Sequence, residues 1–306
     1  MDIPHIPVLL NETISLFENL KSGYFIDCTC GFGGHSEAIL KAYPDIKLIA
    51  IDQDIEALIF AKKRLTPFSD RVEFVHSRAS EVLENFKDLE IAGILADIGV
   101  SSFQLDERKR GFNFEGESLD MRMNQAQEFS AKDVVNYYSL NELERIFRDY
   151  GEDRFAKKIA SKIIERRKEE KFTSSKELAD FIASFIPRKK IHPATQIFQA
   201  IRIEVNSELT ELENILDKSL KIASKGTILG IITFHSLEDR IVKQTFKEWS
   251  KRCICPSDAF RCECGANNEK GKIITKKPLV ASKEEILSNP RSRSAKLRGF
   301  CFREGY

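Results

Sequence analysis

The sequence lacks the features that mark membrane, fibrous and disordered proteins. Its longest strongly apolar run, residues 226–234, is far shorter than the ~20 residues that a membrane helix needs. Glycine and proline are scarce, at 15 and 9 of 306 residues, which excludes collagen-like and proline-rich chains. No basic stretch followed by an apolar one opens the sequence, so we expect no signal peptide. These absences favour a soluble, folded protein.

The chain has seven cysteines, an odd number for a chain of this size. Of the seven cysteines, Cys28 and Cys30 lie at the end of an expected buried strand. This usage favours free thiols in a reducing compartment over a framework of disulfides. We therefore expect a cytoplasmic protein.

Neither sign of charge dominates the whole chain, but the charges are unevenly distributed. The chain has 48 basic and 47 acidic residues, and its formal net charge is +1. Residues 1–100 sum to −7, residues 101–239 to −1 and residues 240–306 to +9. A basic final stretch suggests contact with a polyanion, although a solvated lysine-rich surface explains the charge equally well.

Apolar runs alternate with helical patterns at both ends of the chain. Strands are predicted at 24–28, 47–52, 72–76 and 91–97, with helices from about residue 36 and over 55–65. The alternation resumes with strands at 227–234 and 295–302 and a helix over 237–249. Strands separated by single helices predict βαβ units, which form a parallel sheet with right-handed crossovers.

The middle of the chain has no convincing strand between about residues 104 and 206. Apolar stripes predict helices over 140–150, 155–168 and 176–186, and a further helix follows Pro193. The sequence therefore predicts an α/β protein with a mostly parallel sheet, helices on both faces and an inserted all-helical domain. We expect the sheet domain to comprise residues 1–105 and 207–306, and the insert, for substrate recognition, residues 106–206.

A glycine-rich turn follows the first predicted strand, in Asp27-Cys-Thr-Cys-Gly31-Phe-Gly33-Gly34-His35-Ser36. Glycines there let the backbone approach a ligand closely at the carboxyl edge of a parallel sheet. A tight connection between strand and helix is the alternative interpretation. The turn is not the dinucleotide fingerprint G-x-G-x-x-G, because Ser36 stands where the third glycine belongs.

Two aspartates end later strands of the predicted sheet. Asp52 lies about twenty residues beyond the glycines, where an acidic side chain commonly binds ribose hydroxyls, though it could instead cap a helix. Asp97 could face a cationic sulfonium or an amino group, or it could only cap its own loop. Together the three signals favour an adenosine-containing cofactor and are similar to those of class I S-adenosylmethionine methyltransferases.

More specific motifs extend from about His5 to Arg298, over nearly the whole chain. They include Leu95-Ala-Asp-Ile-Gly-Val-Ser-Ser102, Leu119-Asp-Met-Arg-Met123, His192-Pro-Ala-Thr195, Phe234-His-Ser-Leu-Glu-Asp-Arg240 and Asn289-Pro-Arg-Ser-Arg-Ser-Ala-Lys-Leu-Arg298. On these motifs the chain resembles the bacterial 16S rRNA (cytosine-N4) methyltransferase family (RsmH/MraW). Several of them are not shared with other methyltransferases.

The resemblance implies a Rossmann-like class I methyltransferase core with S-adenosyl-L-methionine as cofactor. The cofactor-binding residues expected from the turn and the family motif are Gly31, Gly33, Gly34, His35, Asp52, Ala79, Asp97 and Gln104. The chain departs from the family at Ala79, where an aromatic residue is usual, and at Gln196, where a basic residue is usual.

The expected reaction is methyl transfer to the exocyclic N4 of a cytosine in the decoding region of 16S rRNA, on the assembled small subunit. Asp97 is the candidate catalytic residue, as an acceptor for the amino hydrogens. The Pro-Pro-aromatic signature of many amino-methylating enzymes is absent after Asp97, so a base clamp would have to come from elsewhere, for instance Phe103. We expect no DNA or membrane partner.

Basic residues in the insert and in the tail are the candidate phosphate contacts. They are Arg188, Lys189, Lys190, Lys276, Lys277, Arg291, Arg293, Lys296 and Arg298. His235 follows the fifth predicted strand, and we expect it to satisfy hydrogen bonds of its loop rather than to position substrate.

Four cysteines form a C-x-C, six-residue, C-x-C cluster at Cys253, Cys255, Cys262 and Cys264. Four thiolates could bind zinc tetrahedrally, but the usual C-x₂₋₄-C spacing is absent. We therefore assign no metal ligand from the sequence and favour reduced surface thiols.

Other classes of function fit the sequence less well. A non-catalytic RNA-binding protein on the same scaffold would bind no cofactor. A DNA amino-methyltransferase is disfavoured by the missing Pro-Pro-aromatic signature, and an NAD-linked oxidoreductase by the missing third glycine.

Overall fold

The computed structural model describes residues 7–187, 191–256 and 261–303, which form two compact units. The first unit comprises residues 1–99 and 211–306, and the second comprises residues 100–210. The boundaries of the second unit therefore lie a few residues outside the boundaries predicted for the insert, 106–206. The role of the second unit in substrate recognition stays a prediction.

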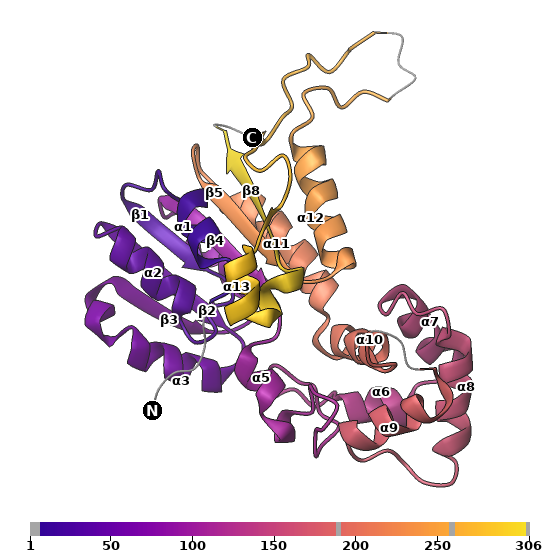
Figure 1. Ribbon diagram of the computed structural model, residues 1–306. Helices are drawn as coiled ribbons and strands as arrows, with labels where there is room; N and C mark the ends of the chain where they lie inside the picture. Colours follow the sequence, from indigo (N-terminus) through magenta and orange to yellow (C-terminus); the bar gives the residue numbers. More distant parts are fainter. Residues whose placement is uncertain (1–6, 188–190, 257–260, 304–306) are drawn as a thin grey trace. The chain divides into compact units, whose positions relative to one another are not determined.

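The first unit is built on one eight-stranded sheet in the order β3-β2-β1-β4-β5-β8-β6, with β7 beside β8 (Figure 1). The strands are β1 (Gly23–Asp27), β2 (Ile46–Asp52), β3 (Val72–His76), β4 (Ile91–Ile98), β5 (Ile228–Thr233), β6 (Gly271–Ile273), β7 (Leu279–Val280) and β8 (Lys296–Phe302). Strands β1 to β5 pair in parallel, whereas β8 is antiparallel to β5, β6 and β7. The predicted mostly parallel sheet is confirmed.

Helices cover both faces of this sheet, as predicted (Figure 1). They are α1 (Leu10–Leu16), α2 (Gly34–Ala42), α3 (Ile55–Arg64), α4 (Ala79–Val82), α11 (Glu208–Ile222), α12 (Ser236–Trp249) and α13 (Lys283–Ser288). Alternate residues of β2 point to opposite faces: Leu48 and Ala50 pack with α1, α2 and α3, while Ile49 and Ile51 pack with α4, α11 and α12. Both faces are thus apolar, as a buried parallel sheet requires.

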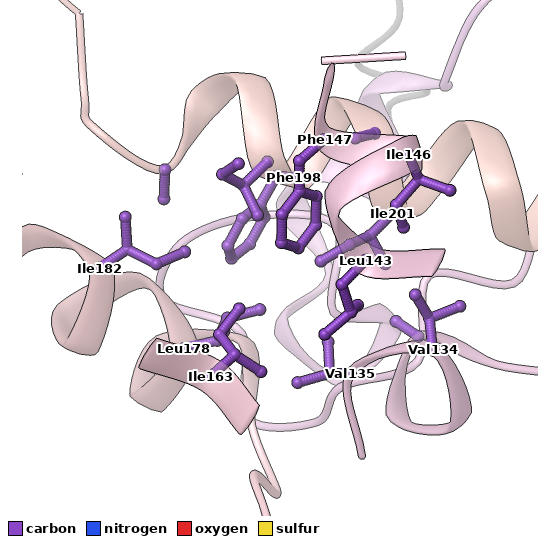
Figure 2. Packing of buried hydrophobic residues seen from close by; sticks show 14 of the residues in the cluster. Val134, Val135, Leu143, Ile146, Phe147, Ile163, Leu178, Ile182, Phe198 and Ile201 are labelled. Carbon is purple, nitrogen blue, oxygen red and sulfur yellow. The ribbon is translucent and has the colours of Figure 1, made fainter. Parts of the chain in front are cut away.

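The second unit is helical, and its described residues contain no strand. Its helices are α5 (Ser102–Asp106), α6 (Ala131–Tyr137), α7 (Leu140–Asp149), α8 (Ala156–Arg166), α9 (Ser175–Phe185) and α10 (Thr195–Asn206). Figure 2 shows their shared core, in which Leu143, Phe147 and Ile163 are fully buried. Ser139 and Glu142 form a capping box that starts α7, so the unit has its own helix signals as well as its own core.

Short elements are the main difference between the predicted and the observed fold. The sequence patterns did not reveal α1, α4, α5, α6, α13, β6 or β7, because segments of two to seven residues show too few repeats of an apolar period, and they did not separate the 15-residue α11 from the helix after Pro193. Among the described residues, no helix is long and apolar enough to cross a membrane.

Replacing Ile94 in β4 by alanine tests the core of the first unit. Ile94 is fully buried at the centre of the sheet, so we expect a loss of about 2–5 kcal/mol in the free energy of unfolding. The measurement is denaturant unfolding followed by the fluorescence of Trp249, the chain's single tryptophan, which packs against Phe300 in the same unit. The control Ile59→Ala, whose side chain is 48% exposed, should change stability by less than about 0.5 kcal/mol. Equal losses would contradict the assignment.

Candidate functional site

Three aspartates lie at one edge of the sheet, where parallel strands end. Asp27 ends β1, Asp52 ends β2, and Asp97 is the penultimate residue of β4. Strand β1 lies between β2 and β4. After β1 the chain adds β2 and β3 on one side of it, and then adds β4 and β5 on the other side, so the strand order reverses at β1. Ligands of open α/β sheets bind outside the carboxyl ends of the strands at such a reversal.

The glycine-rich turn is tied to the neighbouring strand by one hydrogen bond. The backbone N–H of Gly31 donates to Asp52 Oδ2 at 2.7 Å. Gly31 and Gly33 have φ of +53° and +75°, values that favour glycine, and Gly33 is the N-cap of α2. A Cβ at Gly31 would meet a single atom within 4 Å, Thr29 O at 3.9 Å, so the space in front of Gly31 is open.

The carboxylate of Asp52 accepts hydrogen bonds from two backbone segments and can accept further hydrogen bonds from a ligand. Its Oδ1 accepts a hydrogen bond from the backbone N–H of Asp54 at 2.8 Å. The two oxygens offer about four lone-pair sites, of which these backbone bonds use two. Asp54, not Asp52, caps α3, because its side chain accepts from the N–H of Glu56. Burial raises the pKa of Asp52 to about 7, against hydrogen bonds from Asp54 and Gly31 that lower it.

Asp97 has one carboxylate oxygen that lacks a hydrogen-bond partner within the part of the chain that the structure describes. Its backbone N–H donates to Thr29 Oγ1 at 2.6 Å, but its buried Oδ1 has no hydrogen-bond partner among the described residues. Its Oδ2 lies 3.9 Å from Nδ1 of His35, whose Nε2 donates to the Val8 carbonyl at 2.9 Å. Burial, followed by the charges of Asp27 and Glu238, raises the pKa of Asp97 to about 8.

Asp27 completes the acidic edge, although the sequence analysis placed it only in the motif and not in the site. It is buried and accepts hydrogen bonds from Ser36 Oγ at 2.7 Å and from the N–H of Thr29 at 3.2 Å. Burial raises its pKa to about 6 in spite of these bonds. Its position directly before the turn was the available signal.

No lysine or arginine of the described chain forms an ion pair with Asp27, Asp52 or Asp97. Buried acids that lack a cationic partner favour protonation, which is why all three pKa values are raised. A cationic ligand at this edge would supply the missing charge and favour the ionised acids. We call these three residues the acidic edge.

Two of the expected cofactor residues are placed differently from the rest. Ala79 begins α4 and is buried in the apolar cluster with Ile51 and Leu83, so its methyl group contributes to the core. Gln104 belongs to the second unit, where its side-chain oxygen accepts from the N–H of Ser101 in the capping box of α5. The cofactor contacts of both residues stay predictions.

His235 and the buried Glu238 form a local pair at the start of α12. Nε2 of His235 lies 2.8 Å from Oε1 of Glu238, and the N–H groups of Phe234 and His235 donate to Glu238 Oε2. The N–H groups of the loop after β5 are therefore held by Glu238, and the expected role of the His235 side chain stays a prediction. Glu238 was not singled out from the sequence.

Two basic residues of the tail form ion pairs with an acidic side chain of the same unit. Arg298, with a side chain only 10% exposed, donates from Nε to Asp239 Oδ1 at 2.7 Å, and Lys296 Nζ lies 3.2 Å from Asp239 Oδ2. The interpretation of Arg298 as a phosphate contact is therefore wrong, because its guanidinium is buried against a carboxylate. Arg291 and Arg293 are exposed, and residues 188–190 lie outside the described residues.

Comparisons with known proteins give a consistent result over the whole chain. A family model described as the MraW methylase family matches residues 2–303. A protein from Nautilia profundicola named "Ribosomal RNA small subunit methyltransferase H" is 66% identical over 306 residues, which cover 99% of each chain. Relatives of the same name from Aliarcobacter butzleri and Wolinella succinogenes are 59% and 58% identical, over 99% of this chain and 100% of theirs.

Replacing Asp97 by asparagine tests the electrostatics of the acidic edge. An unfolded aspartate loses its proton near pH 4, whereas folded Asp97 keeps it up to about pH 8, so this group destabilises the free protein as pH rises across that interval. We expect Asp97→Asn to raise the melting temperature at pH 8, by the equivalent of about 1 kcal/mol or more, and much less at pH 5. The exposed Asp45→Asn is the control. A gain that does not grow with pH would contradict the burial argument.

Proposed function

The chain belongs to the MraW methylase family, and from this we propose that it transfers a methyl group from S-adenosyl-L-methionine to the exocyclic N4 of a cytosine in 16S rRNA. Three relatives with 58–66% identity carry a name that specifies methylation of small-subunit ribosomal RNA. The observation in the molecule that carries the proposal is the Oδ1 of Asp97 at the acidic edge, for which the described residues offer no hydrogen-bond partner. The position in the decoding region and the assembled subunit as substrate follow from the family resemblance.

The residues at the sheet edge fit this cofactor. When bound, S-adenosylmethionine supplies a methyl group on a positively charged sulfur. The acidic edge has no lysine or arginine partner among the described residues. The space in front of Gly31 is open because glycine has no side chain, and a larger residue at this position would occupy that space. Both features suit a cationic adenosine derivative that approaches the backbone closely.

The acidic edge can bind and orient both reactants. Asp52 has lone pairs left for two ribose hydroxyls, while its bond to Gly31 fixes the turn that the ligand approaches. Asp97 has its Oδ1 available for a hydrogen from a cationic or amino group. Rigid placement of reactants of this kind accounts for a large part of enzymatic rate enhancement.

Asp97 is also suited to the chemistry of an amino group. The lone pair of cytosine N4 is delocalised into the ring, so it attacks poorly unless an acceptor holds the amino hydrogens. Methyl transfer forms an N–C bond, breaks an S–C bond and leaves one surplus proton on N4. The cationic cofactor would favour the ionised form of Asp97, and the resulting carboxylate could accept that proton.

The second unit and the basic tail would hold the RNA. A base must leave its stack to reach a pocket at a sheet edge, so the enzyme needs surfaces that grip the flanking backbone. We assign this role to the helical unit and to exposed basic residues of the tail, Arg291 and Arg293. The reaction would take place in the cytoplasm, where ribosomal subunits are assembled.

The deciding experiment compares substrates with a labelled methyl donor. Purified small ribosomal subunits, naked 16S rRNA and DNA are incubated side by side with the full chain. We expect label in the subunit's RNA, at N4 of a cytosine when the product is digested to nucleosides. Transfer to DNA alone, or to a ring carbon, would overturn the proposal.

Asp97→Asn should lower kcat about 10²–10⁴-fold on that substrate. The variant is expected to be at least as stable as the parent, so the loss would not come from unfolding. Asp45→Asn, which removes an exposed carboxylate of the same unit, should retain full activity. Unchanged kcat in Asp97→Asn would remove this residue from the mechanism.

The double variant Arg291→Ala/Arg293→Ala tests the tail. We expect weaker RNA binding across sequences and a salt dependence of log K shallower by about 1–2, because two phosphate contacts are lost. The control variant Lys63→Ala/Lys87→Ala removes the same charge from exposed positions within residues 1–100, whose net charge is negative. It should leave the salt dependence of log K unchanged. Equal effects in both double variants would indicate a general effect of net charge.

A further inference from the structure

Four cysteines distant from the acidic edge gather in the segment between α12 and β6. The Sγ atoms of Cys253, Cys262 and Cys264 lie 3.6 Å from one another in all three pairs. The Sγ atom of Cys255 joins them, since all four sulfurs lie within 4.8 Å of each other. All four are free thiols, and the sequence spacing alone did not predict this arrangement.

The sulfur spacing matches a tetrahedral metal site. Zinc binds four cysteine sulfurs at about 2.3 Å, which places neighbouring sulfurs about 3.8 Å apart at the corners of a tetrahedron. A disulfide would require sulfurs about 2.05 Å apart, far closer than those seen here. The triangle of 3.6 Å edges is therefore the face of a tetrahedron into which a small cation fits.

The backbone supports the two cysteine pairs in a reciprocal way. Ile254, between the first two cysteines, donates its N–H to Sγ of Cys264 at 3.4 Å. Glu263, between the second two, donates its N–H to Sγ of Cys255 at 3.3 Å. N–H donors directed at sulfur stabilise thiolates and orient them, as the outer shell of a metal site does.

The C-x-C spacing, which argued against zinc at first, is compatible with this geometry. In an extended segment, residues two apart point to the same side, so both sulfurs of a pair can reach one ion. Each pair thus supplies one edge of the tetrahedron. Arginines at positions 252 and 261 directly precede the two pairs in the sequence.

The described part of this segment has no apolar core that could hold it in place. None of the described residues in 251–256 and 261–270 is buried, and Ile254 is 60% exposed. Its other contacts include hydrogen bonds from Asn268 to the carbonyls of Arg252 and Cys264 and ion pairs of Glu269 with Arg252 and Arg303. Segments without a core commonly owe their structure to a metal or to disulfides.

We propose that Cys253, Cys255, Cys262 and Cys264 bind one Zn²⁺ ion that fixes this segment between α12 and β6. Binding replaces four S–H bonds with four Zn–S bonds and releases four protons to solvent, with no change of oxidation state. Four protein ligands close the coordination shell, so the ion has a structural and not a catalytic role. The site is separate from the acidic edge and does not depend on the proposed methyl transfer.

The test is the metal content of the full chain, purified without a histidine tag and kept reduced. We expect about one zinc per chain, and the tetrahedral spectrum of a four-thiolate site when Co²⁺ replaces zinc. Cys253→Ser/Cys262→Ser should lose the metal. Cys301→Ser, which removes a free cysteine outside the cluster, should retain it.

A measurement on the unmodified chain keeps the proposal testable if the double variant does not fold. Titration with a mercurial that modifies thiols should release zinc to a chromogenic chelator as the four clustered thiols react. The proposal is overturned if the chain binds no zinc from added ZnCl₂, if it contains iron and sulfide instead, or if Cys301→Ser also loses the metal.

Discussion

The parallel pairing of β1 with β2 on one side and β4 on the other is the constraint on which the candidate site depends. It brings the carboxyl ends of three strands to one edge, and each strand carries an aspartate there. The bond from Gly31 N–H to Asp52 then fixes the glycine turn against the neighbouring strand. The position of the site is therefore a property of the sheet, and its chemistry is a property of the three acids.

The acidic edge illustrates how a binding site can conflict with stability. Burial raises the pKa values of Asp27, Asp52 and Asp97 to about 6, 7 and 8, so ionising them in the free protein is unfavourable. A cationic ligand removes that penalty and makes the same burial favourable, because charges attract more strongly away from water. The arrangement thus favours a positively charged cofactor over a neutral one of the same shape.

The remaining polar features of the first unit serve structure more than ligand binding. Asp239 holds Arg298 and Lys296, and Glu238 holds His235 and the backbone at the start of α12. The cysteine segment, whose described residues in 251–256 and 261–270 are all at least partly exposed, would gain its order from a metal. The ion pairs thus add polar contacts to β8 and α12, which also pack in the apolar core, whereas the described part of the cysteine segment lacks such packing.

The sequence by itself determined the alternation of strands and helices, the glycine turn and the acids at the strand ends, because these depend on local patterns and spacing. It also determined the helical character of residues 140–206 through apolar stripes. Only the tertiary structure decided that Asp54 and not Asp52 caps α3, that Arg298 is buried against Asp239, and that four cysteines meet. Such pairings join residues with no fixed separation along the chain, so no local pattern can encode them before the chain has folded.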